Sequence, residues 1–89
     1  MFVDRLKHCL YLARMPEQNT LDALGLLCPL PVLKARKRLQ SLKSGDVLTV
    51  YADDPAAIVD VPHFCVEAGH TLVSATQQGS MQAYVIRKR

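Results

Sequence analysis

The stretch Gly25-Leu26-Leu27-Cys28-Pro29-Leu30-Pro31 decides how the chain folds, together with the helix-patterned segment 32–42 that follows it. Pro29 and Pro31 favour a helix start, because the first helical N–H groups have no intrahelical partner to lose. Cys28 is therefore expected at or just before the N-terminus of this helix. That end carries partial positive charge, which stabilises a thiolate, so the sequence predicts a lowered pKa for the Cys28 thiol.

Cys28 is the best candidate for chemistry in the chain, since a thiolate is the form of cysteine that attacks sulfur or carbon. The two prolines lack N–H groups, which leaves those of Leu30, Val32 and Leu33 to face the sulfur. The alternative is that Cys28 is a small hydrophobic residue packed at the helix start. The partial positive charge expected at the helix N-terminus favours the reactive thiol.

The composition indicates one small globular domain. The chain has 89 residues, of which 49% are hydrophobic and 21% are charged. No apolar run approaches the roughly 20 residues of a membrane span. Charged side chains at positions 4, 5 and 7 interrupt any apolar region of a secretory signal, so we expect a cytoplasmic location and no direct membrane contact.

The three cysteines, Cys9, Cys28 and Cys65, are too widely spaced to form a paired disulfide framework. Their odd number favours free thiols in a reducing compartment. His63, Cys65 and His70 lack the paired spacing of zinc ligands, so we expect neither a metal nor another cofactor. Cys65 falls on the apolar face of a predicted helix, which indicates packing rather than reactivity.

The order of predicted elements is strand, helix, strand, helix and a two-strand hairpin. A short strand at 20–24 precedes the helix that runs from Pro29 or Pro31 to Leu42, with Gly45 as its left-handed cap. The β-branched segment 46–52 is the clearest strand. These elements occupy 20–24, 29–42, 46–52, 55–68, 70–76 and 81–88.

Two details of the second helix follow from its prolines and aspartates. Asp54 before Pro55 predicts an N-cap and a first helical residue. Pro62 lies inside the helical pattern, so we expect a break there, with Asp60 capping the second part. A hairpin connection is predicted at 77–80.

This order predicts an α+β two-layer sandwich, in which a mixed four-stranded sheet of βαβαββ order carries two helices on one face. The turn with Cys28 then lies at the carboxyl end of a strand, where open α/β sheets commonly place their sites. Residues 1–18 are predicted to form a separate extension, either a short amphipathic helix or a frayed segment, before a domain at 19–89.

Several segments, in this order, are similar to the signature of the TusA/SirA family of small sulfur carriers. They are Thr20-Leu21-Asp22, Leu24-Gly25-Leu26, Cys28-Pro29-Leu30-Pro31, Asp54-Pro55, Asp60-Val61-Pro62, Phe64-Cys65, Gly69-His70 and Ile86-Arg87-Lys88. The resemblance covers about residues 20–89. It implies the same α/β sandwich. Leu27 stands where many relatives have a basic residue and Leu30 where some have an acidic one, which changes the electrostatics around the thiol.

The resemblance implies a sulfurtransferase that works as a persulfide relay. Carried over by position, Cys28 accepts sulfane sulfur, and Pro29 and Pro31 shape the turn. The implied partners are a cysteine desulfurase or rhodanese-type donor and a downstream acceptor protein. The implied pathways include 2-thiolation of tRNA uridine, sulfur oxidation, molybdenum-cofactor supply and selenium metabolism. A carrier that alternates between partners is expected to be a monomer.

The basic cluster of the first helix supports an alternative function. Lys34, Lys37 and Arg38 are candidates for docking an acidic partner, although surface charge pairs are usually weak. A regulatory or RNA-binding module would use the basic helix 32–43 and need no thiol, but no aromatic stacking platform supports RNA, so nucleic acid is not the expected partner. A cysteine oxidoreductase would need a disulfide from Cys28 to Cys9 or Cys65.

Overall fold

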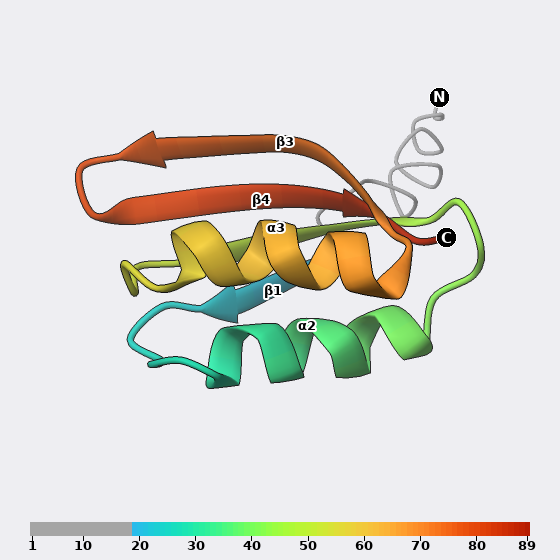
Figure 1. The fold of residues 1–89 in the computed structure, drawn as a ribbon, viewed down its shortest axis with the longest axis horizontal. Coiled ribbons are helices and arrows are strands. Elements are labelled where there is room, and N and C mark those ends of the chain that lie inside the picture. Colours follow the sequence, from blue (N-terminus) through green and yellow to red (C-terminus); the bar gives the residue numbers. More distant parts are fainter. Residues whose placement is uncertain (1–18) are drawn as a thin grey trace, which may run out of the picture.

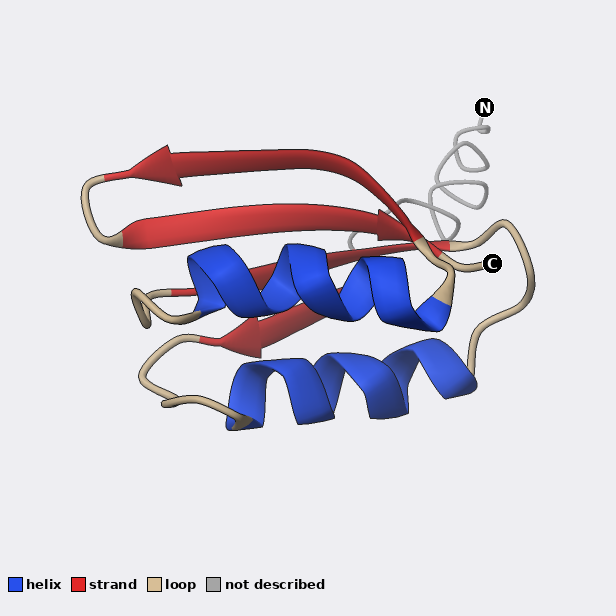
Figure 2. Cartoon of the chain, viewed as in Figure 1, coloured by secondary structure: helices blue, strands red, loops and turns tan. Residues whose placement is uncertain are grey.

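The computed structural model describes residues 19–89, which form two helices and four strands (Figures 1 and 2). The elements are β1 (Thr20–Ala23), α2 (Leu30–Gln40), β2 (Val47–Ala52), α3 (Ala57–Ala68), β3 (Thr71–Gln78) and β4 (Met81–Arg87). Neither helix is long and apolar enough to cross a lipid bilayer. The predictions made for residues 1–18, including Cys9, lie outside the described residues.

The four strands form one mixed sheet in the order β1-β2-β4-β3. β1 runs parallel to β2, and β4 pairs antiparallel with both β2 and β3. The two helices lie side by side on one face of this sheet, as Figure 1 shows. This arrangement confirms the predicted α+β sandwich.

The core lies between the helices and the covered face of the sheet. β2 alternates strictly, with Leu48, Val50 and Ala52 fully buried, as expected for a strand with one covered face. Ala35 and Leu39 of α2 are buried against it, and Val32 and Leu42 pack at its margin. The helix pattern of segment 32–42 thus directs its apolar side chains to the core.

The predicted break at Pro62 is wrong, because α3 runs without interruption from Ala57 to Ala68. Pro62 lacks an N–H group and so removes only the hydrogen bond to the carbonyl of Ile58. Ile58 is a residue of the first turn and is 44% exposed. Buried side chains on both sides of the proline, Val61 and Phe64, anchor the helix to the core. Asp60 therefore caps no second segment and lies in the first turn of α3.

The other differences concern where elements begin and end. The second helix begins at Ala57, because Asp54 first closes a turn: its carboxylate accepts from Ala56 N–H and its carbonyl from Ala57 N–H. The first helix ends at Gln40, so Gly45 is not its cap, although it has a φ of +92° in the following loop. The hairpin turn is shorter than predicted, since Gln78 pairs with Met81.

Candidate functional site

The turn between β1 and α2 places Cys28 at one edge of the sheet. β1 and β2 are parallel, so the turns that follow them meet at that edge. Two aspartates of the turn that follows β2 hold the turn that follows β1. Gly25 N–H donates to Asp53 Oδ1 at 3.0 Å, and Cys28 N–H donates to Asp54 Oδ2 at 2.6 Å. The peptide bond between Cys28 and Pro29 is cis. The backbone around the thiol is thus fixed by the neighbouring loop.

The Cys28 side chain is exposed and donates a hydrogen bond from Sγ to Asp60 Oδ2 at 2.8 Å. Asp60 comes from the first turn of α3. This hydrogen bond raises the pKa of the Cys28 thiol, and desolvation and the negative charges of Asp60 and Asp54 add to the increase. The resting side chain is therefore a thiol held against a carboxylate.

The predicted lowering of the Cys28 pKa is wrong. Leu30 N–H donates to the carbonyl of Leu27 at 2.8 Å, and Leu33 N–H donates to the carbonyl of Pro29 at 3.1 Å. Two of the three N–H groups expected to face the sulfur are thus engaged by backbone oxygens. Asp60 acts on the thiol at hydrogen-bonding distance, and this hydrogen bond is the largest cause of the raised pKa. Cys28 and Asp60 are 32 residues apart in the chain, so this contact could not be predicted from the local sequence.

A buried polar pair supports the loop that holds Cys28. Gln82 of β4 is 2% exposed, and its Nε2 donates to the carbonyl of Asp54 at 3.1 Å. The hydroxyl of Tyr84 donates to Gln82 Oε1 at 2.6 Å. Sequence reasoning did not single out Gln82, yet its position was readable, since it alternates in phase with the buried Tyr84 and Ile86.

A groove of about 240 Å³ opens beside Cys28, between α2 and α3. Its walls combine the apolar surfaces of Val32 and Phe64 with the charged side chains of Arg36 and Asp60. His63 and Glu67 also line the groove and contact each other at 3.2 Å between Nε2 and Oε2. A molecule in this groove would therefore lie against the sulfur.

The basic residues expected to dock partners lie on another side of α2. Lys34, Lys37 and Arg38 line a hollow of about 300 Å³ with Leu21 and Ser41, and none of them lines the groove at Cys28. Arg38 also donates to the carbonyl of Thr20. The cation that the fold brings to the Cys28 groove is Arg36.

The other chemically relevant residues are placed as follows. Pro29 precedes α2 directly, and Pro31 is buried in its first turn. Cys65 is 2% exposed and belongs to the core, which confirms its predicted packing role. Within residues 19–89, no group of three or more histidine, cysteine or acidic side chains is arranged to hold a metal ion.

Comparison with known proteins supports the resemblance found in the sequence. Residues 19–88 match the family described as sulfurtransferase TusA. The structure is also similar to the crystal structure of a SirA-like protein from Desulfitobacterium hafniense. The sequence identity is 28%, the TM-score is 0.69, and the match covers 76% of this chain and 93% of that one. The chain therefore belongs to the TusA family of sulfurtransferases.

Proposed function

We propose that the protein is a sulfur carrier that holds a persulfide on Cys28 and relays its outer sulfur to an acceptor protein. The observation that carries this proposal is an exposed thiol on a turn fixed by Asp53 and Asp54, in a chain of a sulfurtransferase family. Cys28 is the reacting residue, and Pro29 and Pro31 shape the turn that presents it.

In the loading step, the sulfur of Cys28 attacks the outer sulfur of a donor persulfide. A bond forms between the two sulfurs, and the S–S bond of the donor breaks. The S–H proton of Cys28 is released as the new S–S bond forms, and the leaving thiolate of the donor takes up a proton. One thiol and one persulfide are consumed and one of each is produced, so the step needs no oxidant or reductant.

The surface around Cys28 suits contact with a large partner. Leu24, Leu27 and Leu30 flank the thiol in the chain and are 42%, 69% and 44% exposed. Exposed apolar side chains that cluster beside a reactive group are typical of a protein interaction site. The proposed donor is a cysteine desulfurase or rhodanese-type protein, and the proposed acceptor is a protein of a sulfur-trafficking pathway such as tRNA thiolation.

The competing oxidoreductase function would require a disulfide between Cys28 and a second cysteine. Within the described residues the only other cysteine is Cys65, which is buried in the core while Cys28 is exposed. A disulfide between them would require the core to open. The structure of residues 19–89 therefore favours exchange with a partner's sulfur over internal disulfide formation.

The test is sulfur loading followed by intact-mass measurement. The full chain is incubated with a cysteine desulfurase and cysteine, labelled at its thiols and mapped by peptide. We expect a reducible gain of about 32 Da, one sulfur atom, on the Cys28 peptide. Cys28→Ser should abolish the gain and keep the fold, whereas Cys65→Ser serves as the matched control and should retain it. Loading that persists in Cys28→Ser would refute the proposal.

A further inference from the structure

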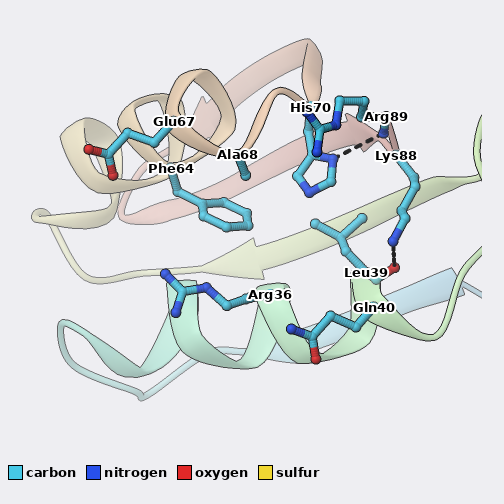
Figure 3. A pocket seen from close by; sticks show the side chains of 9 residues that line it. All are labelled: Arg36, Leu39, Gln40, Phe64, Glu67, Ala68, His70, Lys88 and Arg89. Atoms are coloured by element: carbon cyan, nitrogen blue, oxygen red, sulfur yellow. Dashed lines mark hydrogen bonds between the residues drawn. The ribbon is translucent and has the colours of Figure 1, made fainter.

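A second hollow continues the Cys28 groove toward the far ends of the two helices. It has a volume of about 420 Å³ and lies between α2, α3 and the end of β4 (Figure 3). Arg36, Phe64 and Glu67 line both hollows, so the two form one groove along the helix pair. Together they have the size of a ligand-binding cleft.

The far end of this groove is basic. Arg36, Lys88 and Arg89 line it, and the carboxylate-bearing side chain among its lining residues is Glu67. Glu67 contacts His63 and lies beyond Phe64 in Figure 3, on the side away from His70 and Arg89. The cations have neutral partners: the Arg36 guanidinium lies 5.8 Å from the centre of the Phe64 ring, and Lys88 Nζ donates to the carbonyl of Leu39 at 2.8 Å.

The basic end is built by specific contacts rather than by loose surface side chains. The backbone N–H of Arg89 donates to His70 Nδ1 at 3.0 Å. Its side chain lies over Gly69, where an added Cβ would come within 2.8 Å of Arg89 Cδ. The pKa of His70 is lowered by desolvation and by the charges of Lys88 and Arg89, so its imidazole is neutral at pH 7 and senses a positive field.

The charge of the groove therefore changes along its length. Its Cys28 end carries the carboxylate of Asp60, and its second hollow carries three cations, of which Arg36 lines both hollows. A negative group next to an incoming sulfur would be repelled, whereas one at the far end would be attracted. The charge pattern thus selects both the chemistry and the orientation of a bound molecule.

The distance between the two ends follows from helix geometry. Arg36 and Gln40 lie seven and eleven residues beyond Pro29 on α2, which corresponds to about 10 and 16 Å along the axis. An extended peptide covers about 3.3–3.6 Å per residue, so this distance is spanned by about three to five residues.

We propose that this groove binds an extended segment of a partner protein whose exchanging cysteine meets Cys28 and whose acidic side chain, three to five residues away, is bound by Arg36, Lys88 and Arg89. The inference rests on the proposed function, since it identifies the partner segment that exchanges sulfur with Cys28. It goes beyond that function by naming the chemistry that selects the segment.

The test uses thiol–disulfide exchange with synthetic peptides. Each peptide has one cysteine as a mixed disulfide with thionitrobenzoate, and attack by Cys28 releases the coloured thiolate. In the first set of peptides, aspartate or asparagine lies four residues from the cysteine, either before it or after it in the chain. In the second set, aspartate lies next to the cysteine. The full chain is used, and Cys28→Ser gives the background of the other thiols.

We expect the distant aspartate to accelerate exchange about two- to fivefold over asparagine at low salt, the usual size of a partly exposed ion pair. Arg36→Gln and Arg89→Gln should remove this preference. Lys37→Gln is the matched control, because Lys37 is the next residue of α2 but lines the other hollow, and it should keep the preference. The distant aspartate should also raise the pKa of His70, measured by NMR titration of the complex.

Equal rates for the aspartate and asparagine peptides would overturn the proposal, and so would a preference that Lys37→Gln removes as fully as Arg36→Gln. The peptide assay forms a disulfide, so it does not depend on persulfide loading. Loading of Cys28 without any peptide preference would refute the groove alone. A preference for the distant aspartate without loading would support the groove and refute the carrier function.

Discussion

Gln82→Met should destabilise the protein strongly, because it removes the buried support of the Cys28 turn. Methionine has nearly the same volume but cannot replace either hydrogen bond of the amide. The partly buried carbonyl of Asp54 loses its donor, at a cost of about 1 kcal/mol. The buried hydroxyl of Tyr84 loses its acceptor, at a cost of about 2 kcal/mol. We therefore expect a loss of about 3 kcal/mol in the free energy of unfolding.

The assay is urea denaturation supported by thermal unfolding, in which 3 kcal/mol corresponds to about 12–24 °C for a domain of this size. Gln78→Met is the matched control, since Gln78 is exposed at the end of β3, and it should change stability by less than about 0.5 kcal/mol. Hydrogen exchange of the Cys28 amide, which is bonded to Asp54, should become faster in Gln82→Met but not in the control.

A double-mutant cycle tests whether Gln82 and Tyr84 act as a hydrogen-bonded pair. Tyr84→Phe alone should cost about 1 kcal/mol, but in the Gln82→Met background it removes an unsatisfied hydroxyl and should cost almost nothing or stabilise. The double variant should thus be more stable than the sum of the single effects by about 1 kcal/mol or more. A loss below about 0.5 kcal/mol for Gln82→Met, or strict additivity, would refute the role assigned to this pair.

Two further predictions concern the thiol and the core. Asp60→Asn should lower the pKa of Cys28, because it removes the largest cause of the increase, so the pH profile of alkylation by iodoacetamide should move to lower pH. At neutral pH the variant should react faster, since the gain in thiolate exceeds the loss of nucleophilicity. The control is Asp46→Asn, which removes a carboxylate that accepts from Lys43 N–H and should leave the pH profile unchanged. An unchanged pH profile in Asp60→Asn would contradict the assigned cause of the raised pKa. Leu39→Ala should cost about 2–5 kcal/mol in urea denaturation, because its side chain is 1% exposed in the core. The matched change Leu33→Ala, at a residue that is 45% exposed, should cost clearly less, and equal losses would mean that burial does not set the effect.

The sequence by itself determined the order of the elements and the layer architecture. The alternation of β2 and the apolar stripe of α2 have the periods of a strand and a helix with one covered face, so local pattern was sufficient. The Cys-Pro-x-Pro turn marked the position of the thiol for the same reason, since prolines act on the residues beside them.

Pro62 shows where local reasoning fails even within one element. The sequence showed a residue that lacks an N–H group, which predicted a broken helix. Only the tertiary structure provided the buried contacts of Val61 and Phe64 that hold both sides of the proline in one helix.

The electrostatic state of Cys28 was decided by the tertiary structure alone. Asp60 lies 32 residues away in the chain, and its carboxylate reaches the sulfur only because α2 and α3 pack side by side on the same face of the sheet. The same packing turns Arg36 toward the Cys28 groove while Lys34 and Lys37 line another hollow. Charge interactions act through space over a few ångströms, so a sequence specifies the charged groups, whereas the fold specifies which of them meet.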